Sequence, residues 1–149
     1  MSGTSAVAVK RAIVAKLDAV PALGGDTDVQ VGYGPPTREG IERRVVYLGR
    51  VTFNHRPMAF KAAAGRLQRD EQGTASVHIF VCLPGSTEED AEDAAQVLGT
   101  AVEEAIASDP RLGGALLVTV SGGELDAWTD DDAAYAGLTY RVAFRSQLT

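Results

Sequence analysis

The segment of residues 86–108 constrains the fold more than any other part of the sequence, because it predicts a long helix with one apolar face. Ser86 and Glu89 match a capping box, and Glu88, Glu89 and Asp90 place negative charge at the positive end of the helix dipole. The apolar residues of that face recur at helical spacing: Ala91, Ala94, Ala95, Leu98, Ala101, Val102, Ala105 and Ile106. Since most of them are alanine, we expect this helix to pack closely against a sheet.

A shorter amphipathic helix is predicted over residues 5–20. Its apolar face consists of Val9, Ile13, Leu17 and Val20, which are spaced by four, four and three residues. Thr4 or Ser5 can cap its start, and Pro21 ends it.

The sequence predicts five strands, over residues 29–33, 44–49, 77–83, 115–121 and 135–148, the second of which could continue to Phe53. Alternating side chains indicate the first, third and fifth, and the fourth is strongly apolar. We expect residues 122–134 to form a loop. The element order favours one α+β domain spanning residues 1–149, with a mainly antiparallel sheet of about four to five strands and both helices packed on one face.

Residues 54–73 fit two structures. An Ala-rich centre suits a helix, whereas Gly65 and the polar run before the next strand suit an extended arm that turns back as a hairpin. We favour the arm. Because it carries Arg56, Lys61, Arg66 and Arg69, we expect it to contact neighbouring subunits or another protein.

The charge of the chain is unevenly distributed. The 149 residues carry a formal net charge of −6, but residues 1–72 carry +4 and residues 73–149 carry −10. The negative net charge argues against a general nucleic-acid binder. The opposite charges of the two halves of the sequence suit a self-complementary surface. The single cysteine, Cys82, excludes an internal disulfide, and no apolar run approaches the about 20 residues that span a bilayer. We expect cytoplasmic folding and no membrane partner.

No motif of catalytic or cofactor chemistry occurs in the sequence. His78 and Cys82 share one face of a strand, but four residues of extended chain separate their side chains by about 13 Å, too far to bind one ion. His78 therefore reads as a satisfied or solvent-facing histidine. We expect no catalytic residue, no metal, no cofactor and no enzymatic activity.

Two charged groups remain as candidate interface residues. Asp130, Asp131 and Asp132 lack the alternating spacing of a calcium-binding loop and are expected to be solvated. Arg141 and Arg145 project from the polar side of the last strand, where they could bind a carboxylate ligand, bind a neighbouring subunit, or be solvated.

The order of these elements resembles that of the tail terminator proteins of long-tailed bacteriophages, also called tail completion or minor tail proteins, particularly those of phages that infect actinobacteria. The most specific parts are the run from Arg69 through Pro84 and Gly85 into the acidic helix start, and the turn DPRLGG at residues 109–114. The opening helix SAVAVKRAIVAKLDAV, the strand segments VQVGYGPP and RVVYLGRV, and the closing strand GLTYRVAFRSQL extend the resemblance over almost the whole chain.

This resemblance implies a structural virion protein. Such a subunit forms a hexameric ring at the head-proximal end of the tail tube, stops tube polymerisation and offers the surface for head or neck joining. The implied partners are further copies of the chain, the tail tube protein and a neck or head-completion protein; DNA passes through the pore without sequence-specific binding. Assembly would take place in the host cytoplasm.

The expected contacts with other subunits or the tube involve Arg56, Lys61, Arg66, Arg69, Trp128, Asp130, Asp131, Asp132, Arg141 and Arg145. Two alternatives stay open. One is another phage neck or head–tail connector protein, since small α+β adaptors share this size and composition. The other is a small-ligand binding module, which a deep pocket lined by His78, Cys82 or Arg141 would favour.

Overall fold

The computed structural model describes residues 3–24, 28–36, 43–57 and 69–148. In chain order the elements are α1 (Ala6–Asp18), β1 (Val29–Gly32), β2 (Arg44–Pro57), β3 (Arg69–Pro84), α2 (Glu88–Ala107), the 3₁₀ turn η2 (Leu112–Gly114), β4 (Leu117–Thr129) and β5 (Ala133–Leu148). None of the helices within these ranges is long and apolar enough to cross a membrane.

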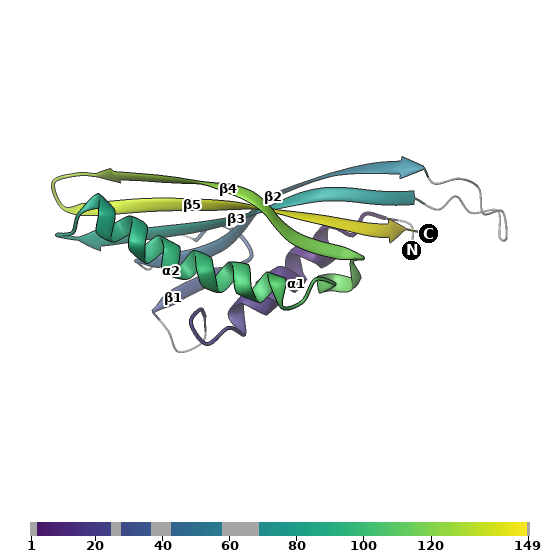
Figure 1. The fold of residues 1–149 in the computed structure, drawn as a ribbon, viewed down its shortest axis with the longest axis horizontal. Helices are drawn as coiled ribbons and strands as arrows, with labels where there is room; N and C mark the ends of the chain where they lie inside the picture. Colours follow the sequence, from purple (N-terminus) through teal and green to yellow (C-terminus); the bar gives the residue numbers. More distant parts are fainter. Residues whose placement is uncertain (1–2, 25–27, 37–42, 58–68, 149) are drawn as a thin grey trace.

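The five strands form one sheet in the order β1-β2-β3-β5-β4. β1 runs parallel to β2, whereas the pairs β2–β3, β3–β5 and β4–β5 are antiparallel. Both helices lie on the same side of this sheet (Figure 1). The predicted α+β class is therefore confirmed, with one parallel pair at the edge of the mainly antiparallel sheet.

The strand β3 shows how the sheet separates a buried face from an open one. Ala75, Val77, Ile79 and Val81 are at most 1% exposed and belong to the core that both helices cover. The alternate residues Ser76, His78, Phe80 and Cys82 lie on the opposite face, where no helix of the described residues packs (Figure 1). We call this second surface the open face.

Helix α2 lies very close to the sheet, as its alanine-rich stripe predicts. Ala91 and Ala95 are fully buried. A side chain at Gly99 would place its Cβ 2.5 Å from the Tyr140 hydroxyl and 2.6 Å from a methyl group of Leu138. Small residues along this face let the helix approach β5 at a distance that larger ones would prevent.

The capping box of α2 begins one residue later than expected. Thr87, not Ser86, is the N-cap: its Oγ accepts the Asp90 N–H at 3.2 Å, and its own N–H donates to the Asp90 carboxylate at 3.4 Å. The backbone of Thr87 is extended, with φ −95° and ψ 165°, and the helix starts at Glu88. The pair Ser86 and Glu89 has the same spacing, so the sequence pattern alone does not separate the two registers.

Substituting the observed cap tests this assignment. Thr87→Ala should lower the free energy of unfolding by about 1 kcal/mol, because the Asp90 N–H loses its acceptor. Thr87→Ser keeps a hydroxyl and should change it by only a few tenths of that amount. Urea unfolding of both variants measures the difference. A larger loss for Ser86→Ala than for Thr87→Ala would contradict the observed cap.

The predicted loop over residues 122–134 is wrong, because most of it is strand. β4 continues to Thr129, and β5 begins at Ala133, so that the two strands form a long hairpin. Gly122 and Gly123 weaken the sequence signal for a strand, but in the structure they follow a shift of register between Val120 and Gly122. The pairing then continues to the end of β4.

The arm is a hairpin as far as the structure describes it. Residues 54–57 complete β2 and residues 69–73 begin β3, with Asn54 paired to Gln72 and Pro57 paired to Arg69. This pairing confirms the extended arm for these residues and excludes a helix there. The rest of the predicted arm, residues 58–68, lies outside the described residues.

Candidate functional site

The charged residues predicted to lie at interfaces fall at opposite ends of the sheet. Arg56, Arg69 and Arg145 lie at the end we call the arm end, where β2 and β3 extend beyond the helices (Figure 1). Asp130, Asp131 and Asp132 form the turn between β4 and β5 at the opposite end, which we call the hairpin tip. Lys61 and Arg66 lie outside the described residues.

These two ends cannot meet within one subunit. β3 pairs with β5 from Arg69 opposite Leu148 to Pro84 opposite Ala133. Fifteen residue steps of extended strand at about 3.3 Å each separate the ends by about 50 Å. Any contact between the arginines of the arm end and the carboxylates of the hairpin tip must therefore join two copies of the chain.

The hairpin tip carries a cluster of aromatic rings on the open face. The rings of Trp128 and Tyr135 are stacked, with centroids 5.6 Å apart and planes 12° apart. Phe80 lies 6.3 Å from Trp128 and 6.0 Å from Tyr135. Trp128 nevertheless keeps 43% of its surface exposed, which suits a side chain that a partner covers.

Asp130 has a structural role in the turn at the hairpin tip. Its Oδ1 accepts the N–H groups of Asp132 and Ala133, both at 2.8 Å, and its Oδ2 accepts the hydroxyl of Tyr135 at 2.8 Å. The backbone N–H of Asp132 and the other donors hold the pKa of Asp130 below its ordinary value. The hydrogen bond that the Tyr135 hydroxyl donates to Asp130 raises the pKa of Tyr135 to about 12. Asp131 and Asp132 are exposed.

At the arm end, Arg145 is held by an internal ion pair. Its Nε donates to Oδ1 of Asp70 at 3.0 Å, and Asp70 is only 4% exposed. Half of the Arg145 side chain remains accessible. This internal ion pair is a role that the sequence did not predict for Arg145, and the accessible half of the side chain remains available to a partner.

Arg141 occupies the middle of the open face, between the two ends. It pairs across the sheet with Ser76 on one side and Gly122 on the other. A Cβ built at Gly122 would lie 2.6 Å from an Nη atom of Arg141, so the guanidinium covers this glycine. Arg141 is exposed, but its side chain lies across the sheet over Gly122 and does not project straight into solvent.

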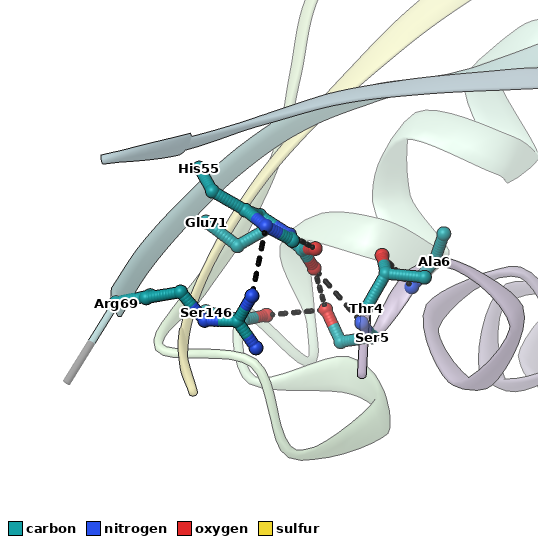
Figure 2. A network of polar contacts seen from close by, with 7 residues as sticks. All are labelled: Thr4, Ser5, Ala6, His55, Arg69, Glu71 and Ser146. Atoms are coloured by element: carbon teal, nitrogen blue, oxygen red, sulfur yellow. Dashed lines mark hydrogen bonds and ion pairs between the residues drawn. The ribbon is translucent and has the colours of Figure 1, made fainter. Parts of the chain in front are cut away.

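A buried carboxylate joins the arm end to the rest of the subunit (Figure 2). Glu71 is fully buried, and its Oε1 accepts both the backbone N–H, at 2.9 Å, and the hydroxyl of Ser5. His55 Nε2 lies 2.7 Å from its other oxygen. The Ser5 hydroxyl also lies 2.9 Å from that of Ser146. We call this group of residues the Glu71 clasp, since it ties the start of α1 to β2, β3 and β5.

Hydrogen bonds keep Glu71 ionised despite its burial. Burial raises the pKa of the carboxyl, but the donors Ser5, Thr4 and His55 outweigh it, so the pKa lies below its ordinary value. Arg69 places Nη1 3.4 Å from Nδ1 of His55. The His55 ring therefore bridges Arg69 and Glu71.

The sequence does not predict the Glu71 clasp. The one indication in the sequence is that position 71, a glutamate, is an even number of residues from Ala75 and Val77 and so lies on the buried face of β3. Thr4 and Ser5 were the two candidate caps of α1. The Ser5 side chain makes no cap bond, whereas the Thr4 hydroxyl accepts the Ala6 N–H at 3.1 Å.

His78 is the satisfied histidine that the sequence indicated. Its Nδ1 lies 2.9 Å from the Thr139 hydroxyl, and its ring lies 5.0 Å from that of Tyr47. Burial lowers the pKa of His78, which favours the neutral ring. Within the described ranges no group of three or more His, Cys, Asp or Glu side chains could hold a metal ion.

The open face also has a hollow of about 390 Å³ near the arm end. Half of its lining residues are uncharged and polar, among them Thr52, Asn54, Gln72 and Thr119. Its charged lining residue is Arg145, which is already paired with Asp70. Neither His78, Cys82 nor Arg141 lines this hollow. It therefore gives no support to the small-ligand alternative.

Taken together, the fold and these surfaces define a small α+β domain whose distinctive groups lie on exposed strand ends. No protein-family model and no curated protein sequence matches the chain. Its fold is similar to that of a chain in a structure described as "Virion of native gene transfer agent (GTA) particle", with a TM-score of 0.56 and 18% sequence identity. The match covers 97% of this chain and 100% of that chain, so the two share the whole fold.

Proposed function

We propose that the chain is a structural subunit of a phage-like virion. The observation that carries this proposal is the fold match with the gene transfer agent particle, which extends over both chains from end to end. Exposed aromatic and charged side chains at both ends of the sheet suit a subunit that works through contacts with other proteins. The proposal assigns the chain no catalytic step.

Within the virion, we propose the role of tail terminator. The resemblance of the sequence to that family supports a hexameric ring at the head-proximal end of the tail, where the chain ends tube polymerisation and joins the neck or head. Its partners would be further copies of itself, the tube protein and a neck or head-completion protein. A head–tail connector is the alternative, since it would use the same class of surfaces.

The interface residues of this proposal occupy the two ends of the sheet. The arm end offers Arg56 and the exposed half of Arg145, and the hairpin tip offers Trp128, Asp131 and Asp132. Asp130 contributes by shaping the tip. A ring needs a heterologous interface, in which one surface of a subunit binds a different surface of the next. Opposite charges about 50 Å apart on one subunit provide two such surfaces.

Electron microscopy of particles made without this chain tests the role. If the chain terminates tails, its loss should give tails of uncontrolled length without attached heads, and supplying the gene in trans should restore a uniform length. Tails of normal length that fail to join heads would assign the chain to the connector class instead. Intact particles with normal tails would overturn the structural role.

A further inference from the structure

Exposed aromatic side chains lie toward both ends of the sheet and point to opposite sides of it. Trp128 of the hairpin tip is in register with Cys82 through β5, so it lies on the open face. Phe53, near the arm end, pairs with Gly73, which is two residues from the inward-facing Ala75, so it lies on the helix-bearing face. The two side chains are 43% and 42% exposed. Exposed aromatic residues of this kind are typical of the centres of protein interfaces.

The charged residues beside these two rings have matching spacings. Glu124 lies four residues from Trp128 along β4. Pro57 lies four residues from Phe53 along β2, and its partner on β3 is Arg69. Because both spacings are even, Glu124 shares the face of Trp128, and Arg69 shares the face of Phe53. Each surface therefore presents an aromatic ring and, about 13 Å away along the strands, a charge that is negative beside Trp128 and positive beside Phe53.

The two spacings also run in the same direction. β2 runs toward the arm end and β4 toward the hairpin tip, so each charge lies on the arm-end side of its ring. We consider one arm end laid with its helix-bearing face on the open face of another copy's hairpin tip, with the strands of both copies aligned. Phe53 over Trp128 then sets Arg69 level with Glu124. Arg69 stands one strand, about 4.8 Å, to the side of Pro57, a distance that an arginine side chain spans.

A ring of copies brings these two faces together. Successive copies in a ring turn the same face of the sheet to the same side, so overlapping ends of neighbours meet through opposite faces. Phe53 and Trp128 lie about 30 Å apart along the strands, since nine residue steps separate their partners Gly73 and Cys82 on β3. A rotation axis perpendicular to the line between the two rings keeps both at one height. The contact is heterologous, as ring closure requires.

We infer that copies of this chain overlap end to end, with the helix-bearing side of one arm end covering the aromatic cluster on the hairpin tip of the next copy. Phe53 packs on Trp128, and Arg69 pairs with Glu124. Asp126, two residues from Trp128 on the same face, adds to the negative charge that Arg69 meets. This inference deepens the proposed function and rests on it for the closure into a ring.

The reverse overlap has no comparable match. In it the open face of the arm end would meet the helix-bearing side of the hairpin tip. The arm end would then contribute polar side chains such as Asn54 and Gln72, and the tip would set the exposed Leu125 against them. Interface centres are enriched in aromatic residues, so the first overlap is favoured.

Trp128 is the one tryptophan of the chain, so its fluorescence reports on this contact directly. Sedimentation velocity of the full chain over rising concentrations should show self-association, and the Trp128 emission should shift to shorter wavelength as Phe53 covers the ring. Phe53→Ala should weaken association at least about tenfold, as expected for a residue at the centre of an interface, and should remove the shift. Glu124→Arg should weaken association as well, because it meets Arg69 with a like charge.

Mixing two defective variants tests the heterologous geometry. Phe53→Ala keeps an intact hairpin tip, and Trp128→Ala keeps an intact arm end. Together they should form a 1:1 complex with the affinity of a wild-type contact and grow no further, since each copy retains one working surface. A mixture that stays monomeric would contradict the pairing of these two surfaces.

Matched controls lie next to the tested residues on the opposite faces. Asn54→Ala and Leu125→Ala replace exposed residues of the same two strands and should leave association and the fluorescence shift unchanged. Circular dichroism checks that every variant is folded.

Three results would overturn the inference: association that responds to Asn54→Ala and Leu125→Ala instead, association without a shift of the Trp128 emission, or a wild-type chain that stays monomeric at its highest soluble concentration. Tails of uncontrolled length in particles without the chain would still support the proposed function in each case, so the two failures are distinguishable.

Discussion

Ile106→Asp should abolish the folded state. Ile106 is fully buried in the core between α2 and the sheet. An unpaired carboxylate there costs several kcal/mol, against a total stability of about 5 to 15 kcal/mol for a typical domain. Far-ultraviolet circular dichroism and thermal melting measure the result.

The control at the same position is Ile106→Val, which removes one methylene and should cost about 1 kcal/mol while keeping a cooperative transition. A native spectrum with a cooperative melt for Ile106→Asp would contradict the observed placement of α2 against the sheet.

Glu71→Gln should cause the second large loss of stability, about 3 kcal/mol. The amide keeps the shape of the side chain but loses the charge, and its NH2 end must take the place of the oxygen that faces either Ser5 or His55. Chemical unfolding measures the loss. Glu104→Gln removes an exposed carboxylate from α2 and should leave stability within about 0.5 kcal/mol. Equal effects of the two substitutions would contradict the Glu71 clasp.

The pH dependence of stability provides an independent check on Glu71. Its pKa is lower in the folded chain than the ordinary 4.5, since hydrogen bonds from Ser5, Thr4 and His55 outweigh burial. The folded state therefore binds this proton less readily than the unfolded state does. Its contribution to stability is fully present above pH 4.5 and falls as the pH drops through the folded pKa. In Glu71→Gln this part of the acid destabilisation should disappear.

The sequence predicted the regular elements well where periodicity was continuous. The apolar stripe ending at Ile106 defined α2, and the alternation around Val77 and Val81 defined the centre of β3. The predictions from sequence were wrong where two local patterns were equivalent or where glycines interrupted the periodicity of a strand. Thr87 and Ser86 offer equivalent capping patterns, and the pair Gly122 and Gly123 masks a strand that pairing with β5 stabilises.

The candidate interface was predicted only in part, because sequence spacing does not give positions in space. The basic and acidic groups were both identified, but only the register of β3 with β5 places them at opposite ends of the sheet. Arg145 was expected at the surface, and half of it is exposed, yet its partner Asp70 lies 75 residues away in sequence. Contacts over such separations leave no local pattern.

The arrangement of the two ends has a consequence for assembly. A rigid sheet about 50 Å long separates the arginines of the arm end from the carboxylates of the hairpin tip. The Glu71 clasp fixes the root of the arm to α1 and β5 (Figure 2), so the arm end keeps a defined direction relative to the body. Preorganised surfaces of this kind lower the entropy lost when subunits associate.

Electron cryo-microscopy of the particles that contain this chain tests the proposed role most directly. We predict density for this fold in six copies, arranged as a ring between the last layer of the tail tube and the neck. The same fold found within the head vertex, along the length of the tube, or in no part of the particle would contradict it.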